Sequence, residues 1–445
     1  MQFFLRDESS ARLRAFGNTR SRGLTVAAVC CYVLMLAMQL YVLLSFRGEP
    51  ISDAARYVGT AMRCVREGHL YPVAADFVGK GTAGTGYVNL LIPLLRLTGS
   101  VRSAYILNMF FVQILLLSVL TLAYRATASP DVCACTAVFF CLSAPYWSEI
   151  CVARTELCFS ALAFAALALL FRKRGGLPFL AGLLLAYANW VRPLGIPFFV
   201  SALWVLLYHR QKWHSYARLL AGAAVMVAAI CLFTYHSSGR FVYQPTIGSG
   251  NLLIGANADA DGSYSDAVFA EGNAGFIPSA QKKTMDYTEI NAVYSAAAKA
   301  WIRENPGKYI SLIPKKLFYM YATDTYAGEV YFDNLKTTAG KDYVRRIADM
   351  LRGQDRAWTF GDVVICYGQA FYMLTFALFL WGVIRSMRRG YWRSLSFLYG
   401  IFLIGTAMVC LTVGSGRYHF PYLPVLQITA AAAVESAAHS RRVQK

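Results

Sequence analysis

The chain has 445 residues, of which 57% are hydrophobic and only 15% are charged. A soluble protein of this size needs far more charge on its surface, so this composition excludes a conventional soluble enzyme and indicates a protein embedded in lipid. The net charge of +19 comes from basic residues dispersed over many segments. This dispersal favours anionic lipid over nucleic acid as the partner.

Charge-poor stretches approaching the ~20 residues that cross a bilayer recur along the chain. Each can cross hydrocarbon as a helix, because a helix satisfies its own backbone hydrogen bonds. The sequence therefore predicts an all-α polytopic membrane protein with about ten transmembrane helices and interfacial helices in the loops. The predicted spans are residues 24–46, 104–123, 132–147, 157–171, 177–191, 194–208, 219–235, 363–384, 395–413 and 420–434.

The orientation follows from the basic residues, because short loops rich in Lys and Arg remain cytoplasmic. The basic residues before the first span, in the short loops and at the C-terminus fall on one face of the predicted topology, whereas 20 of the 24 acidic residues fall on the other. The outer loop 47–103 also carries Arg47, Arg56, Arg63, Arg66, Lys80, Arg96 and Arg102, which the rule tolerates because loops approaching ~60 residues escape it. Both termini are therefore predicted to be cytoplasmic. The basic residues of the cytoplasmic face are Arg6, Arg12, Arg14, Arg20, Arg22, Arg125, Arg172, Lys173, Arg174, Arg210, Lys212, Arg218, Arg385, Arg388, Arg389, Arg393, Arg441, Arg442 and Lys445.

The topology divides the chain into three parts. Residues 1–235 form an N-terminal module of seven spans that includes an extracytoplasmic loop, 47–103. Residues 236–362 form a large extracytoplasmic loop, and residues 363–445 form a C-terminal module of three spans. The first span lacks a small-residue cleavage site, which is typical of a retained signal anchor.

Both long loops contain segments with helical patterns. Residues 53–67 place Tyr57, Ala61 and Cys64 on one face of a surface helix, and residues 87–97 are apolar but too short to span. In the second loop, residues 287–304 are predicted to be helical up to the Asn305-Pro306 breaker. The amphipathic stretch 309–321 follows, and Lys315 and Lys316 at its centre argue against a further span.

Two local patterns suggest chemistry only weakly. Residues 79–84 match G-x-G-x-x-G, but without a strand before and a helix after in a βαβ unit the glycines are interpreted as turn residues. Asp259, Asp261 and Asp266 could bind a hard cation or form a polar turn, so a divalent metal cofactor stays open. Cys64 and Cys151 are both expected outside the membrane, which leaves a disulfide between them open.

Acidic residues close to predicted span ends are the candidates for catalysis. Asp53 follows the first span and could accept a proton from an acceptor hydroxyl, or it could be a solvated charge at a helix end. Glu49 competes for either role. Glu149, Arg154 and Glu156 lie in a short turn near the bilayer, where charges are costly enough to suggest a use, although a plain turn is the alternative.

Arg192 and Arg417 are isolated cations on the predicted outer face, where the charge rule disfavours them. A guanidinium can hold a phosphate through two parallel hydrogen bonds, which suggests a lipid phosphate as ligand. The alternative is that each arginine reaches ordinary headgroups. Tyr418 and His419 could assist, and Lys315 and Lys316 are further cations at the same interface.

These residues belong to a series of short motifs that resembles the GT-C superfamily of membrane glycosyltransferases, especially protein O-mannosyltransferases and the lipid A aminoarabinose transferase. The order and membrane placement of the motifs carry the resemblance, which extends over most of the chain. The motifs are Ser52-Asp53 through Gly68-His69-Leu70-Tyr71-Pro72, Arg154-Thr155-Glu156-Leu157, Arg192-Pro193-Leu194-Gly195, Asn251 to Asn257 with Asp261-Gly262 and Glu304-Asn305-Pro306, and Arg417-Tyr418 with Pro421 and Pro424.

The resemblance implies inverting transfer of a sugar from a polyprenyl-phosphate donor to a glycan, lipid or protein acceptor. Asp53 would be the general base, and Glu156 would orient the acceptor or the base. Arg192 and Arg417, with Lys315 or Lys316, Tyr418 and His419, would bind the donor phosphate, while Tyr57 and Arg154 would contact acceptor or sugar. The chain departs from the pattern in having fewer spans than well-known members and a single Asp where an adjacent acidic pair is usual.

Two other functions remain open. A lipid-linked sugar flippase or transporter would be expected to carry polar residues within its spans and repeat symmetry. A polysaccharide polymerase or ligase would use the outer arginines on a lipid pyrophosphate without needing Asp53. The absence of an Asn-x-Ser/Thr site in the predicted outer loops favours a bacterial inner membrane as the location.

Overall fold

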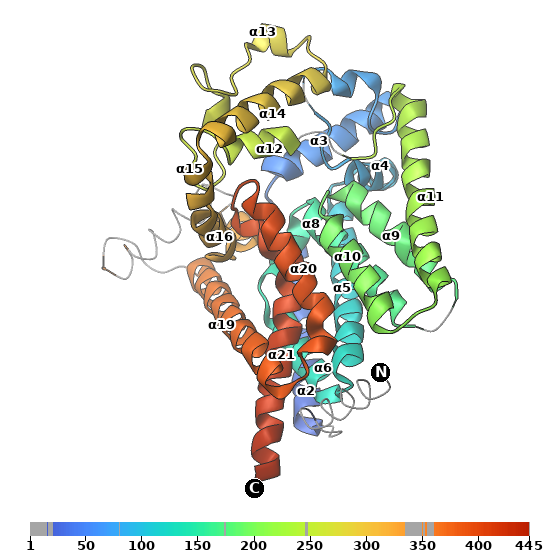
Figure 1. The fold of residues 1–445 in the computed structure, drawn as a ribbon, viewed down its shortest axis with the longest axis vertical. Helices are drawn as coiled ribbons and strands as arrows, with labels where there is room; N and C mark the ends of the chain where they lie inside the picture. Colours follow the sequence, from blue (N-terminus) through green and yellow to red (C-terminus); the bar gives the residue numbers. More distant parts are fainter. Residues whose placement is uncertain are drawn as a thin grey trace.

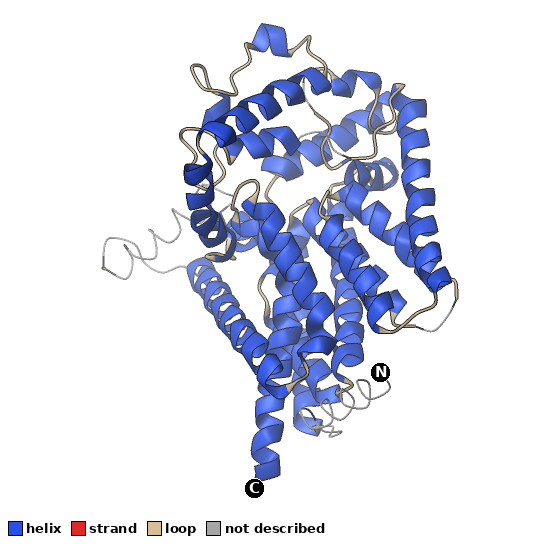
Figure 2. Cartoon of the chain, viewed as in Figure 1, coloured by secondary structure: helices blue, strands red, loops and turns tan. Residues whose placement is uncertain are grey.

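The computed structural model describes residues 16, 21–79, 81–172, 175–244, 248–333, 349, 352–353 and 360–444. This part of the chain contains helices and two isolated bridges but no β-strand (Figure 2). The predicted all-α class is confirmed. Predictions that concern Arg6, Arg12, Arg14, Arg20, Lys80, Lys173, Arg174 and Lys445 lie outside the described residues.

Among the described residues, five helices are long and apolar enough to cross a membrane, and each coincides with a predicted span. They contain 19 to 30 residues, which at about 1.5 Å per residue matches the thickness of the hydrocarbon layer. The chain is therefore an all-α polytopic membrane protein. The five helices are α2 (Arg22–Ser45), α5 (Arg102–Thr127), α11 (Trp213–Ser238), α19 (Phe360–Arg389) and α20 (Trp392–Cys410).

The other five predicted spans coincide with helices that fall short of these criteria, so the count of ten spans stays a prediction. Four of them are short: α6 (Pro130–Leu142), α8 (Thr155–Leu170), α9 (Leu177–Val191) and α10 (Gly195–Tyr208). The fifth is α21 (Leu423–Gln444). Nearly every residue of α8 is buried, and so are residues 423–433 of α21, whereas only 17% of the apolar window of α2 is buried. The helix α8 and the first half of α21 therefore lie at the centre of the bundle, where other parts of the protein surround them.

The two long loops fold at the same end of the bundle. Figure 1 shows α3, α12 and α14 together at the top, whereas the beginning of α2 and the end of α21 lie at the bottom. Both loops therefore share one face of the described chain, opposite the beginning of α2 and the end of α21. The helices of the two loops are α3 (Ser52–Glu67), η1 (Ala74–Phe77), α4 (Thr85–Thr98), α12 (Gly248–Ile254), η3 (Asp266–Phe269), α13 (Ser279–Lys282), α14 (Tyr287–Glu304), α15 (Pro306–Ser311), α16 (Ile313–Tyr321) and α17 (Tyr326–Asp333).

Local signals account for the ends of these helices. The Asp286 side chain accepts a hydrogen bond from Thr288 at the start of α14, and Glu289 completes a capping box. The helix ends at Asn305, before Pro306, as predicted. The amphipathic segment 309–321 is divided between α15 and α16 because Pro314, in the first turn of α16, has no N–H to continue the preceding helix.

The predicted surface helix 53–67 is confirmed, with its predicted apolar face buried. Gly79 and Gly84 have φ values of 76° and 58°, which confirms their interpretation as turn residues. The possible disulfide between Cys64 and Cys151 is not formed, because both are free thiols buried in the packed interior. Three short helices complete the described chain: α7 (Pro145–Ser148), η2 (Glu149–Cys151) and η4 (Gly416–Tyr422).

Candidate functional site

Asp53 lies in the first turn of α3 and contacts two arginines. Its Oδ2 is 2.6 Å from Nη1 of Arg417, and its Oδ1 is 2.9 Å from Nη2 of Arg56, one helical turn further on. Burial disfavours the charged carboxylate, but the two guanidinium groups outweigh it and lower the pKa of Asp53. The carboxylate is therefore ionised at neutral pH, with both oxygens engaged.

Arg417 and Arg192 meet at one aromatic ring. Arg417 is in η4, the short 3-10 helix that follows α20, and its guanidinium carbon lies 5.5 Å from the centre of the Tyr418 ring. The guanidinium carbon of Arg192 lies 5.7 Å from the centre of the same ring. The structure thus brings together Asp53, Arg192, Arg417 and Tyr418, which we call the arginine cluster.

Arg192 reaches the cluster from the end of α9. This helix stops at Val191 because Pro193 disfavours helical backbone in the residue before it. Nη1 of Arg192 lies 3.1 Å from Oε1 of Glu156 and donates a hydrogen bond of 3.0 Å to Oγ1 of Thr155. Since Glu156 is in the first turn of α8, the positive end of the helix dipole also favours its negative charge.

A second ion pair, between Glu149 and Arg154, lies in the turn before α8. Both side chains are almost completely buried, and the guanidinium carbon of Arg154 lies 4.1 Å from the centre of the Tyr326 ring. Burial raises the pKa of Glu149 to about 7, although Arg154 opposes this effect. Arg154, predicted to contact acceptor or sugar, is enclosed by protein in this structure.

Tyr57 is also enclosed. Its side chain is buried on the inner face of α3, where it packs against Gly84. A Cβ on Gly84 would lie 2.5 Å from Cε1 of Tyr57, so only glycine permits this contact. The guanidinium of Arg56 lies 5.5 Å from the centre of the Tyr57 ring, which connects Tyr57 to the partner of Asp53.

His419 follows Tyr418 in η4, and its side chain is buried. Its Nδ1 is 2.7 Å from the carbonyl oxygen of Met320, and its Nε2 is 3.1 Å from Oδ1 of Asp324. Its ring also stacks on Tyr372 of α19, with the ring centres 4.7 Å apart. Both ring nitrogens therefore have protein partners, which connect η4 to α16 and to the segment that follows it.

The two lysines of α16 have different environments. Lys315 is exposed, whereas Lys316 is buried and its Nζ donates to the carbonyl oxygen of Cys410 at 3.1 Å, near the end of α20. Burial lowers the pKa of Lys316 to about 8. Gly414 packs so closely that an added Cβ would lie 2.1 Å from the carbonyl oxygen of Lys316. Lys316 thus joins α16 to α20.

Sequence reasoning missed three residues of the site: Arg56, Asp324 and Tyr326. Arg56 could have been found, because residues three apart on a helix are neighbours and Asp53 precedes it by three. Asp324 and Tyr326 lie between two predicted elements and carry no local signal for a role. Only the packing of α17 against α7 and α19 places them beside the site.

The acidic residues of the large loop do not form a metal site in the described residues. No group of three or more His, Cys, Asp or Glu side chains there is arranged to hold a metal ion. Oδ1 of Asp261 accepts hydrogen bonds from the backbone N–H of Ser263 at 2.8 Å and from its hydroxyl at 2.6 Å. This is the geometry of a polar turn, one of the two possibilities that the sequence left open.

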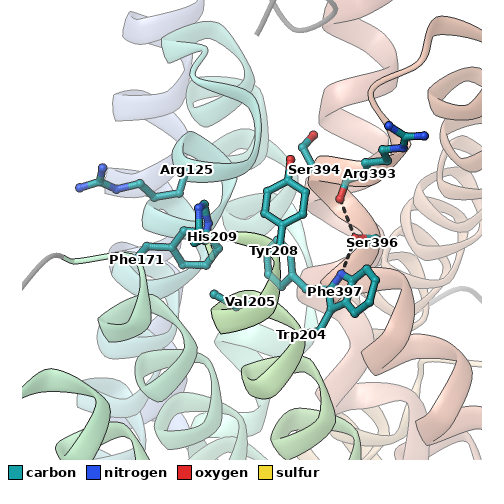
Figure 3. A pocket seen from close by; sticks show the side chains of 10 residues that line it. All are labelled: Arg125, Phe171, Trp204, Val205, Tyr208, His209, Arg393, Ser394, Ser396 and Phe397. Carbon is teal, nitrogen blue, oxygen red and sulfur yellow. Dashed lines mark hydrogen bonds between the residues drawn. The ribbon is translucent and has the colours of Figure 1, made fainter. Parts of the chain in front are cut away.

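A cavity lies elsewhere, among the ends of α5, α8 and α10 and the beginning of α20. It is lined by Arg125, Phe171, Trp204, Val205, Tyr208, His209, Arg393, Ser394, Ser396 and Phe397. Figure 3 shows aromatic rings between Arg125 and Arg393, whose guanidinium groups point away from each other. About 28 Å of α20, at 1.5 Å per residue, separates this end of the helix from the end that leads to the cluster. We therefore do not assign the cavity to the functional site.

No protein-family model and no curated protein matches the chain. Solved structures of an oligosaccharyltransferase from Archaeoglobus fulgidus, in the apo form and in complex with Zn and sulfate, each have a TM-score of 0.46 and 12% identity and cover 94% of this chain and 51% of theirs. The archaeal oligosaccharyltransferase AglB from Archaeoglobus fulgidus, in complex with an inhibitory peptide and a dolichol-phosphate, has a TM-score of 0.43 and 12% identity, covering 95% and 51%. The chain spans about half the length of these proteins, and a likeness this low carries no argument about its activity.

Proposed function

We propose that the chain is an inverting glycosyltransferase that moves a sugar from a polyprenyl-phosphate donor to an acceptor on the extracytoplasmic face of the membrane. One observation carries the proposal: Arg192 and Arg417, from distant parts of the chain, meet at the Tyr418 ring, and Arg417 pairs with the carboxylate of Asp53. These residues lie in the first turn of α3, directly after α9 and in η4.

The arrangement provides the groups that such a transfer needs. The acceptor hydroxyl oxygen attacks the anomeric carbon, and its proton passes to Asp53. The bond between that carbon and the phosphate oxygen breaks, and its electron pair leaves with the polyprenyl phosphate. Arg192 and Arg417 stabilise the negative charge that develops on this phosphate, and charge-assisted hydrogen bonds suit that role.

The buried groups around the cluster hold it in place. Glu156 and Thr155 orient the guanidinium of Arg192, and the pair formed by Glu149 and Arg154 supports the turn before α8. Lys315 is exposed on α16 close to Phe318, whose side chain is 65% exposed. This part of α16 suits contact with lipid headgroups and chains at the membrane surface.

The distribution of charge favours this function over a transporter. The cluster gathers at helix ends and in η4, whereas a lipid-linked sugar flippase is expected to place charged groups within its spans. A polysaccharide polymerase or ligase differs in not requiring Asp53. The role of Asp53 therefore separates the proposed function from both alternatives.

Replacing the carboxylate tests the proposal directly. With the full chain in lipid nanodiscs and a panel of polyprenyl-phosphate hexoses and pentoses, we expect Asp53→Asn to slow release of polyprenyl phosphate by roughly 10²- to 10⁴-fold, because the general base is lost. Asp286→Asn is the matched control. Asp286 is paired with Arg240, its side chain is 23% exposed like that of Asp53, and asparagine preserves its helix cap. Undiminished turnover by Asp53→Asn would refute the proposed base.

A further inference from the structure

The contact between Asp53 and Arg417 places two proposed roles in conflict. Asp53 has to be free to accept a proton, yet both of its oxygens are engaged by guanidinium groups. Arg417 has to bind a phosphate, yet its Nη1 lies 2.6 Å from a carboxylate oxygen. A phosphate bound at Arg417 would place a second negative group beside the carboxylate of Asp53, and neighbouring like charges repel.

We propose that Arg417 is transferred from Asp53 to the donor phosphate, so that Asp53 is released as a base only when a lipid phosphate has bound. This inference rests on the proposed function and adds an order of events to it. While the site is empty, the ion pair keeps the carboxylate a weak base. When the phosphate arrives, it takes over the guanidinium and leaves the carboxylate free for the acceptor proton.

The two side chains are accessible enough for such an exchange. Asp53 and Arg417 have 23% and 20% of their side-chain surface exposed, whereas those of Glu149 and Arg154 are 6% and 2% exposed. Water or a ligand can therefore replace either partner of the Asp53–Arg417 pair without leaving a charge enclosed in protein. The pair of Glu149 and Arg154 cannot exchange partners in this way, because separating it would leave a buried charge without a partner or water.

Neighbouring contacts limit the movement that the exchange needs. Arg56 bonds the other oxygen of Asp53 from the same helix, so the carboxylate keeps one partner after Arg417 has moved. The bonds of His419 to Met320 and Asp324 hold η4, and with it the backbone of Arg417.

The Arg192 guanidinium is held by more deeply buried partners than that of Arg417. Its carboxylate partner Glu156 is 2% exposed and Thr155 is buried, so this arginine remains in place. Its buried Nε has no hydrogen-bond partner in the part of the chain that the structure describes. Arg192 therefore offers the phosphate a guanidinium that does not have to move, while Arg417 completes the contact.

Phosphate binding tests the exchange without requiring the natural sugar or acceptor. The probe is a short-chain polyprenyl monophosphate, titrated into the full chain in nanodiscs, with the corresponding polyprenol as the uncharged reference. If the carboxylate competes for Arg417, Asp53→Asn should bind the probe roughly fivefold more tightly than the native chain, the scale of a water-accessible ion pair. Asp286→Asn, the same charge change away from the cluster, should leave the affinity unchanged.

A double substitution separates competition from simple repulsion. In an Arg417→Gln background, Asp53→Asn should improve binding less than twofold, because the shared arginine is absent. An equal improvement in both backgrounds would mean repulsion through space and would overturn the exchange. Unchanged or weaker binding by Asp53→Asn would also overturn it, while native binding of the probe would leave the proposed function standing. If the native chain does not prefer the phosphate to polyprenol, the proposed function and the exchange both fail.

Discussion

Two of the arginine–carboxylate pairs of the site, Arg154 with Glu149 and Arg417 with Asp53, have the same chemistry but different surroundings. Arg154 and Glu149 are sealed inside the turn before α8, with side chains 2% and 6% exposed. Arg417 and Asp53 join η4 to the first turn of α3, with side chains 20% and 23% exposed. The difference in burial distinguishes a pair enclosed by protein from a pair that, under our proposal, exchanges partners.

The physical reason is desolvation. Removing one partner of a sealed pair leaves the other charged in a medium that solvates it poorly, so such pairs stay closed. A pair that water reaches contributes little net stability, because each partner is well solvated when they separate. The chain therefore places its enclosed arginine at the cap of α8 and its exchangeable arginine in the short η4 segment.

The largest effect on stability is expected at the buried pair of Arg154 and Glu149. Arg154→Met should lower the free energy of unfolding by about 3–5 kcal/mol, because it leaves Glu149 buried without its cation and removes the contact with Tyr326. Thermal unfolding of the detergent-solubilised protein would measure this loss. Arg218→Met is a control on an exposed arginine that donates to the carbonyl oxygen of Gly175. Similar unfolding temperatures for the two variants would remove the distinction between sealed and accessible arginines.

An intermediate effect is expected on ligand binding. Arg192→Gln and Arg417→Gln should each weaken binding of the polyprenyl monophosphate by about tenfold, because each removes a charge-assisted hydrogen bond worth about 1.5–3 kcal/mol. Titration in nanodiscs would measure the affinities, with unfolding temperatures recorded in parallel. Arg240→Gln, at an arginine paired with Asp286 outside the cluster, serves as the control. Native affinity in both variants would argue against phosphate capture.

The smallest effect is expected at Arg56, the exposed partner of Asp53. Its side chain is 48% exposed, so Arg56→Gln should change the free energy of unfolding by less than about 1 kcal/mol. Sugar transfer should change by less than roughly threefold, because Gln can still donate a hydrogen bond to the carboxylate. Unfolding and turnover measured on one preparation would check both values. A large loss of turnover would mean that Arg56 takes part in the reaction and does not only position Asp53.

Several elements of the fold follow from local sequence. The end of α14 was predicted because the Asn305-Pro306 breaker is a short-range signal. The long apolar helices were predicted because lipid imposes a minimum length on a spanning segment. The division of 309–321 between α15 and α16 was not predicted, although Pro314 is a local signal for it; Pro93, in contrast, lies inside the continuous helix α4.

Other features depended on packing between distant segments. The possible pairing of Cys64 with Cys151 failed because a shared side of the membrane does not imply contact. His419 was expected at the donor phosphate, but its two ring nitrogens contact Met320 and Asp324. Lys316 donates to the carbonyl oxygen of Cys410 on α20, and no residue near Lys316 in the sequence predicts this contact.

The sequence alone determined that the chain is a helical membrane protein, whereas the placement of its isolated charges on the outer face stays a prediction. Hydrophobic length, helix caps and proline breaks act over a few residues, so they can be read without a structure. Only the tertiary structure decided which charges meet, since Asp53 and Arg417 are 364 positions apart in the chain. Their contact depends on how α3, α8 and η4 pack, and burial then determines which ion pair is sealed and which is open to exchange.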